Sequence, residues 1–164
     1  MAKPGLPLFS WVRQHKAFVA AGALILLADR ASKVWALTYL AQHGPVRFGT
    51  YLWLNYVQNT GAAFGLFQNA NVLLIAVMLA VIGYLIYTWR DLSRYGCLAR
   101  WGAVCMLSGA LGNLYDRITL GFVVDFIDMR VWPVFNVADS FITVGAVLLG
   151  VCLLQKPHPA EEKA

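Results

Sequence analysis

The stretch "FNVADSFITVG", Phe135–Gly145, opens the last strongly apolar run of the chain and places Asn136 and Asp139 in its first turns. A helix of roughly 20 residues crosses a hydrocarbon core of about 30 Å, and the run Val137–Leu154 is long enough to do so. Ionisable side chains at membrane depth are costly, and they usually face a protein interior or a water-filled site. Asp139 is therefore a candidate functional residue.

The whole chain has the composition of a membrane protein, since 60% of its 164 residues are hydrophobic and only 13% are charged. An ordinary soluble domain carries about 25% charged residues. The spacing of the apolar windows predicts one domain, residues 1–164, that is mainly α-helical. We expect four transmembrane helices: Ala17–Tyr39, Asn71–Trp89, Leu98–Tyr115 and Val137–Leu154.

The distribution of Lys and Arg predicts the orientation, because positive residues in short loops stay cytoplasmic. Only Arg47, Arg117 and Arg130 lie in the two long connections, which we expect to be extracytoplasmic. Both termini should be cytoplasmic, because the other flanking positive residues surround them and the short connection: Lys3, Arg13, Lys16, Arg90, Arg94, Arg100, Lys156 and Lys163. The net charge of +5 is then explained by the orientation of the helices in the membrane. The sequence contains no basic cluster with interleaved aromatic residues, so we expect no nucleic-acid partner.

Two other features of the sequence argue against alternative interpretations. A cleaved secretory signal would explain the basic amino terminus, but the apolar run continues through Asp29 and Lys33 without a small-residue cleavage site. The cysteines and histidines lack metal-ligand spacing, so we expect neither a metal nor another cofactor: Cys97, Cys105, Cys152, His15, His43 and His158.

Each long connection contains a stretch rich in β-branched and aromatic residues. These stretches are "TYLWLNYV", Thr50–Val57, and "GFVVDFIDMRVWPVF", Gly121–Phe135. We expect them to form a small sheet on the outer side, whose strand topology the sequence does not determine. Its aromatic residues should be directed toward lipid headgroups: Trp53, Tyr56, Phe122, Phe126 and Trp132.

Polar residues gather at the same outer rim. Asn113 lies three residues before Asp116, and Asn136 lies three before Asp139, so each pair shares a helix face. The two helices run in opposite directions, which brings both pairs to the outer rim. On the first helix, Asp29 and Lys33 are four residues apart and are expected to form a structural ion pair.

Asp125 and Asp139 are the candidate catalytic pair. Two carboxyl groups that share a site cannot both ionise easily, so they can hold one proton and a water between them. That arrangement suits peptide hydrolysis by general acid and base without a metal. The spacing alone leaves a second interpretation open, in which Asp125 caps a turn and Asp139 caps the last helix.

With these residues in place, the chain resembles lipoprotein signal peptidase, the signal peptidase II family of bacterial membrane aspartyl endopeptidases. Each block that carries the resemblance is weak alone, but together and in this order they are specific. The blocks are "DRASK", Asp29–Lys33; "NTGAAFG", Asn59–Gly65; "GNLYDR", Gly112–Arg117; and "VVDF", Val123–Phe126, followed by "FNVADS", Phe135–Ser140.

The resemblance implies that Asp125 and Asp139 are the catalytic dyad. It also implies that four residues line the same site and support the substrate: Asn59, Asn113, Arg117 and Asn136. Asp116 belongs to the motif and either pairs with Arg117 or anchors the loop, whereas Asp128 matches no motif and its role stays open. Four transmembrane helices, an extracytoplasmic β cradle and a mobile surface segment over the site are implied as well.

The same resemblance implies the substrate and the location. The substrate is a prolipoprotein whose cysteine already carries a diacylglyceryl group, and the cut falls immediately before that cysteine. We expect a multi-pass, monomeric protein of the bacterial cytoplasmic (inner) membrane, in contact with membrane lipid and with its active site at the extracytoplasmic face.

Two other classes of function are compatible with some of these residues. Asp29, Asp116 and Asp139 could form a proton relay in a small proton-coupled transporter, and a non-enzymatic assembly factor is equally conceivable. The charges collect at one rim, and no matching group lies in the second helix, so a continuous proton path is not indicated.

Overall fold

The computed structural model describes residues 15–61 and 70–155. Its helical elements are α2 (Lys16–Trp35), the π-helical turn η1 (Ala36–Leu40), α3 (Ala41–His43), α4 (Asn71–Thr88), the 3-10 turn η3 (Asp91–Tyr95), α5 (Cys97–Thr119) and α6 (Val137–Leu154). Its strands are β1 (Val46–Phe48), β2 (Leu52–Asn59) and β3 (Val123–Asp128). The four long helices match the four predicted apolar windows.

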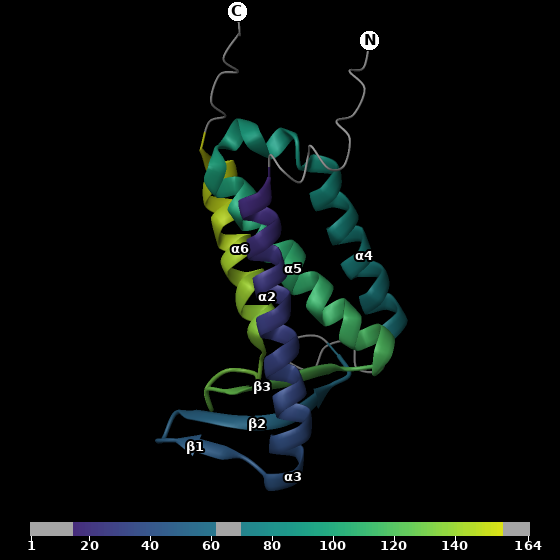
Figure 1. The fold of residues 1–164 in the computed structure, drawn as a ribbon, viewed down its shortest axis with the longest axis vertical. Helices are drawn as coiled ribbons and strands as arrows, with labels where there is room; N and C mark the ends of the chain where they lie inside the picture. The colour runs from purple at the N-terminus through teal and green to yellow at the C-terminus, as the bar shows by residue number, and fades with distance from the viewer. Residues whose placement is uncertain (1–14, 62–69, 156–164) are drawn as a thin grey trace, which may run out of the picture.

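The long helices form a bundle with the sheet at one end (Figure 1). Helices α2, α5 and α6 lie side by side, and α4 packs against α5 on the side away from α2 and α6 (Figure 1). The first turn of α2, the last turn of α6 and the connection η3 lie at the end opposite the sheet (Figure 1). Lys16, which begins α2, and Arg94 in η3 therefore lie at the end opposite the sheet.

Small residues allow α5 to approach its neighbours closely. A Cβ added at Gly145 of α6 would lie 2.5 Å from the carbonyl oxygen of Gly102 in α5. A Cβ added at Gly112 of α5 would lie 2.5 Å from Asp29 Oδ2 in α2. Because only glycine leaves this space, the backbones of α5 and α6 approach closely, and the Asp29 side chain of α2 fits against α5.

The sheet is antiparallel, with the strand order β1-β2-β3. Strand β2 pairs with β3 from Trp53↔Asp128 to Asn59↔Val123, with a shift of register between Leu54 and Val57. The predicted pairing of the two long connections is confirmed. Strand β1 was not predicted, and it pairs with β2 as a short outer strand.

One face of the sheet packs against the end of α2 and η1. Ala36, Leu40, Val124 and Phe126 form a buried cluster there. Phe126 is only 5% exposed, so the expectation that it faces lipid headgroups was wrong. Its position in β3 directs it to the protein interior instead.

Two of the four long helices, α4 and α6, are long and apolar enough to cross a membrane. Helices α2 and α5 carry more charged residues and do not meet the same standard within the described ranges. In α2 these charges include Asp29 and Lys33, which are 2% and 0% exposed.

Several residues named above lie outside the described residues: Lys3, Arg13, Lys156, Lys163, His158 and the motif end 62–65.

Candidate active site

A cavity of about 880 Å³ lies where the helix bundle meets the sheet. Its walls come from β2, α4, α5, β3, the segment after β3 and the first turns of α6. Five of the predicted site residues line it: Asn59, Asn113, Arg117, Asp125 and Asp139. Most of the remaining lining is apolar and includes Leu74, Val77, Met78, Val131, Trp132 and Phe135.

Asp139 reaches the cavity from the first turn of α6. This helix begins with a capping box, in which Asn136 Oδ1 accepts from the Asp139 N–H at 2.8 Å and Asp139 Oδ2 accepts from the Asn136 N–H at 3.2 Å. The capping role that the sequence left open is therefore real for Asp139. Its other oxygen, Oδ1, lies 2.7 Å from Asn113 Nδ2.

Asp125 reaches the same cavity from β3 and is 1% exposed. Its Oδ1 accepts from Asn136 Nδ2 at 2.7 Å, and its Oδ2 accepts from Asn59 Nδ2 at 2.8 Å. Asn136 thus contacts both aspartates. Its side-chain nitrogen donates to Asp125, its backbone N–H donates to Asp139, and its side-chain oxygen accepts from the Asp139 N–H. The fold brings together Asp125, Asp139 and the asparagines at 59, 113 and 136.

The surroundings of Asp125 favour its protonated form. Burial, followed by the negative charge of Asp139, raises the pKa of Asp125 to about 7, although the donors Asn59 and Asn136 oppose the shift. Repulsion between the two carboxylates is the behaviour expected of a pair that shares one proton.

Asn113 is oriented by its neighbours on both sides. Its Oδ1 accepts from Lys33 Nζ at 2.8 Å and from Asn136 Nδ2 at 3.1 Å. An ammonium group can only donate, so the amide oxygen of Asn113 must face Lys33. The amide nitrogen is consequently the group that faces Asp139.

Arg117 lines the cavity, and its hydrogen bonds are with neighbouring segments of the cavity wall. Its guanidinium donates to the carbonyl oxygen of Gly61 at 2.5 Å and to Asn71 Oδ1 at 3.3 Å. Asn71 Nδ2 donates back to the carbonyl oxygen of Arg117 at 3.1 Å. Sequence reasoning missed Asn71, although a polar residue at the start of an otherwise uncharged apolar window was a usable signal.

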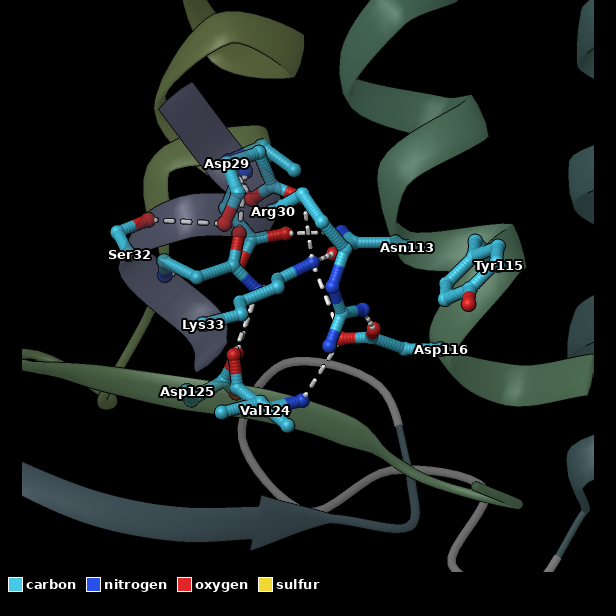
Figure 2. A network of polar contacts seen from close by, with 12 residues as sticks. Asp29, Arg30, Ser32, Lys33, Asn113, Tyr115, Asp116, Val124 and Asp125 are labelled. Carbon is cyan, nitrogen blue, oxygen red and sulfur yellow. Dashed lines mark hydrogen bonds and ion pairs between the residues drawn. The ribbon is translucent and has the colours of Figure 1, made fainter. Parts of the chain in front are cut away.

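Four charged residues outside the cavity lining, Asp29, Arg30, Lys33 and Asp116, form a group that we call the Lys33 cluster (Figure 2). All of them except Arg30 are buried. The predicted ion pair is confirmed, since Lys33 Nζ lies 2.9 Å from Asp29 Oδ2. Asp116 pairs with Lys33 at 3.1 Å and with Arg30 at 2.7 Å.

Asp116 also accepts from the backbone N–H of Val124 in β3 at 3.2 Å. Of the two roles left open for Asp116, anchoring of the chain after α5 is the one that this contact supports. Among the described residues its ion-pair partners are Arg30 and Lys33 rather than Arg117.

Asp128 lies outside the cavity lining. It accepts from the Arg130 N–H at 2.8 Å and from the Arg130 guanidinium at 3.2 Å. Arg130 has a φ of 62°, which non-glycine residues adopt rarely, so these contacts stabilise a tight turn after β3. That turn leads into the segment Met129–Phe135, which lines the cavity.

In residues 15–61 and 70–155, no group of His, Cys, Asp and Glu side chains is arranged to hold a metal ion. Cys97, Cys105 and Cys152 are free thiols. A reaction without a metal or another cofactor stays a prediction.

The chain is similar to known proteins over most of its length. Residues 21–155 match the family model of signal peptidase (SPase) II. The chain is 43% identical to the lipoprotein signal peptidase of Syntrophomonas wolfei over 86% of its own length and 95% of that protein. It is also 43% identical to the lipoprotein signal peptidase of Caldanaerobacter subterraneus over 82% of its own length and 93% of that protein.

The fold is also similar to that of a solved protein. A solved bacterial membrane enzyme superposes with a TM-score of 0.80 at 25% identity, covering 91% of this chain and 94% of that one. With the family model covering most of the chain and relatives aligned almost end to end, this protein belongs to the signal peptidase II family.

Proposed function

We propose that this protein is a membrane aspartyl endopeptidase that removes the signal peptide from a diacylglyceryl-modified prolipoprotein, cutting immediately before the lipidated cysteine. The observation that carries the proposal is the contact of Asn136 with both Asp125 and Asp139 at one cavity. Membership of the signal peptidase II family supports the reaction and the substrate class.

In the proposed reaction, Asp125 starts protonated and Asp139 starts charged. The pKa of Asp125, raised to about 7, supports the first assignment. The position of Asp139 in the first turn of α6 supports the second, since the amino-terminal end of a helix favours negative charge. The two aspartates then differ in their roles because one lies on a buried strand and the other at a helix terminus.

Hydrolysis follows from these two states. Asp139 takes a proton from water as the water oxygen bonds to the scissile carbonyl carbon, and Asp125 gives its proton to the carbonyl oxygen. When the tetrahedral intermediate collapses, the carbonyl re-forms and returns its proton to Asp125. The C–N bond breaks as Asp139 gives its proton to the leaving amine of the lipidated cysteine. Both aspartates return to their starting states.

The cavity suits a substrate that is partly peptide and partly lipid. Asn59, Asn113 and Arg117 supply polar groups close to the reacting carbonyl. The apolar residues of α4 and of the segment after β3 supply a surface for the signal peptide and the acyl chains, among them Leu74, Val77, Met78, Val131 and Trp132.

The proposed location is the bacterial cytoplasmic membrane, with α2, α4, α5 and α6 of one domain, residues 1–164, all crossing it. Helices α2 and α5 can do so although they contain charges, because Asp29, Lys33, Asp116 and Arg117 are buried inside the bundle. Lys16, Arg90, Arg94 and Arg100 lie at or beside the helix ends opposite the sheet, which supports cytoplasmic termini and an extracytoplasmic site. A monomer contains all the residues of the proposed site.

The proton-coupled transporter is not supported. Asp29 and Asp116 are paired with Lys33 and Arg30, so they are poorly suited to a relay that must take up and release protons. Family membership also favours a peptidase.

The test offers the purified protein in lipid a peptide containing a lipoprotein cleavage sequence, with and without diacylglycerol on its cysteine. We expect cleavage before the cysteine in the lipidated peptide and little in the other. Equal cleavage of both would contradict the substrate class. No cleavage, together with proton flux in liposomes, would favour the transporter.

A further inference from the structure

Each proposed catalytic aspartate directly follows a residue whose backbone N–H is bound by a carboxylate outside the cavity. The Ala138 N–H, next to Asp139, donates to Asp29 Oδ1 at 2.9 Å. The Val124 N–H, next to Asp125, donates to Asp116 Oδ2 at 3.2 Å. Asp29 lies on α2 and Asp116 on α5, so two different helices hold the backbone beside the two aspartates.

Lys33 joins these two carboxylates. Its Nζ lies 2.9 Å from Asp29 Oδ2 and 3.1 Å from Asp116 Oδ2. The same atom donates to Asn113 Oδ1 at 2.8 Å. An ammonium group has three donors, and the three contacts match them at a side chain that is 0% exposed. Figure 2 shows Lys33 between Asp29, Asn113 and Asp116, with Val124 and Asp125 below.

The third contact leads directly to the site. With Asn113 Oδ1 held by Lys33, Asn113 Nδ2 donates to Asp139 Oδ1 at 2.7 Å. Lys33 is therefore connected to the aspartates through three residues. Asp29 binds the backbone N–H beside Asp139, and Asp116 binds the backbone N–H beside Asp125. Asn113 donates to the Asp139 carboxylate itself.

We propose that Lys33 is a positioning residue that sets the separation and orientation of Asp125 and Asp139. This inference rests on the proposed function, because it requires the two aspartates to act as a pair. Lys33 is not part of the cavity lining, and its hydrogen bond and ion pairs are with Asn113, Asp29 and Asp116, so it positions the two aspartates through those three residues.

Stability alone is a weak reason for such a cluster. Removing charges from water is costly, and well-packed apolar residues often replace a buried ion pair without loss of stability. The Lys33 cluster contains two cations and two anions, and Arg30 alone among them is appreciably exposed. Apolar residues could not form the hydrogen bonds that the cluster makes with the Ala138 N–H, the Val124 N–H and Asn113 Oδ1.

The first test uses the charge-balanced double variant Lys33→Met with Asp29→Asn. The amide oxygen introduced by Asp29→Asn can still accept from the Ala138 N–H, and Asp116 keeps Arg30 and the Val124 N–H as partners. The double variant therefore removes the connection while keeping the separate backbone contacts and the net charge of the cluster. The matched control removes an exposed pair at the other end of the molecule, Asp91→Asn with Arg94→Gln.

Cleavage of the lipidated peptide is measured as kcat and KM separately. A misplacement of about 1 Å can lower a rate about 10²-fold, so kcat of the Lys33→Met/Asp29→Asn variant should fall by about that factor while KM stays within about threefold of its original value. The Asp91→Asn/Arg94→Gln control should keep both constants. A folded Lys33→Met/Asp29→Asn variant with unchanged kcat would overturn the inference.

A second variant does not depend on the charge change. Gly112→Ala would place a methyl group 2.5 Å from Asp29 Oδ2, so the carboxylate must move although every charge remains. Gly83→Ala is the control, because nothing lies within 4 Å of a Cβ added there. We expect Gly112→Ala to lower kcat with little change of KM and to increase hydrogen exchange at the Ala138 amide. Unchanged kcat and unchanged exchange would contradict the positioning role.

The two proposals can fail separately. Asp125→Asn is assayed beside the other variants. If Asp125→Asn is inactive while Lys33→Met/Asp29→Asn keeps its kcat, only the positioning inference is wrong. If Asp125→Asn cleaves at the original rate, the catalytic pair is wrong and the positioning inference with it.

Discussion

The side-chain amide of Asn136 donates to Asp125 Oδ1 at 2.7 Å. The same residue is the N-cap of α6, where it forms a capping box with Asp139. The feature that begins the helix is thus also the feature that places one aspartate beside the other. Helix capping and the proposed catalysis are therefore compatible uses of Asp139.

Two substitutions at Asn136 can separate these uses. Asn136→Ala removes both the cap and the contact with Asp125, and loss of a cap costs about 1 kcal/mol of stability. Asn136→Ser restores a good capping residue but cannot reach Asp125. We expect Asn136→Ser to recover thermal stability relative to Asn136→Ala without recovering kcat. Recovery of kcat by Asn136→Ser would show that capping alone is what Asn136 supplies.

The pKa of Asp125, raised to about 7, predicts how activity depends on pH. If Asp125 must donate a proton, kcat/KM should fall as pH rises through about 7, with the apparent value belonging to the coupled pair. A profile of kcat/KM between about pH 5 and 9, measured with the lipidated peptide, checks this. A rate that keeps rising above neutrality would assign the proton to another group.

The same shift predicts a stability effect. The folded state holds the Asp125 proton more tightly than the unfolded chain, whose aspartates have a pKa of about 3.9. The contribution of Asp125 to stability is therefore fully present below that value and is lost as pH rises through about 7. Asp125→Asn should lose this pH dependence, so its stability relative to the original protein should rise between about pH 4 and 7 in thermal unfolding.

Chelators and thiol replacement test the proposed metal-free reaction. Replacing Cys97, Cys105 and Cys152 together by Ala should leave cleavage largely intact, because none of the three lines the cavity. EDTA should not abolish cleavage. Strong inhibition that Zn²⁺ or Mg²⁺ reverses would require a metal ligand set in the mechanism.

Reporter fusions test the orientation. Because positive residues surround the termini and η3, reporters placed near Arg94 or after Lys163 should indicate cytoplasm. One placed near Gly49, between β1 and β2, should indicate the opposite side. An extracytoplasmic signal at Arg94 would reverse the proposed location of the active site.

Much of the fold could be predicted because its helices correspond to long apolar windows. The predicted window Val137–Leu154 coincides with α6, and the pairing of the two long connections follows from their β-branched residues. Strand β1 escaped prediction because Val46–Phe48 is too short to show an alternating pattern. The buried position of Phe126 depends on which face of β3 meets η1, and that is decided by tertiary packing.

The residues of the candidate site could be predicted from the sequence, but the contacts between them could not. The intervals between Asn113 and Asp116 and between Asn136 and Asp139 indicated shared faces. The contact from Asp29 to the Ala138 N–H joins residues far apart in the chain, and helix periodicity says nothing about such contacts. The partners of Asp116 were likewise beyond local spacing, because Arg30 and Lys33 come from another helix.

The assignment of Asp125 and Asp139 as the catalytic pair is tested most directly by measuring cleavage of the lipidated peptide by Asp125→Asn and Asp139→Asn. Asp128→Asn is the control. Each amide keeps nearly the same shape but cannot cycle a proton, so each single variant should lose most of its kcat, and the double variant should be about as inactive. Asp128→Asn should cleave nearly normally, because Asp128 does not line the cavity and the amide oxygen of Asn can still accept from the Arg130 N–H. Near-normal cleavage by Asp125→Asn together with loss in Asp128→Asn would contradict the assignment.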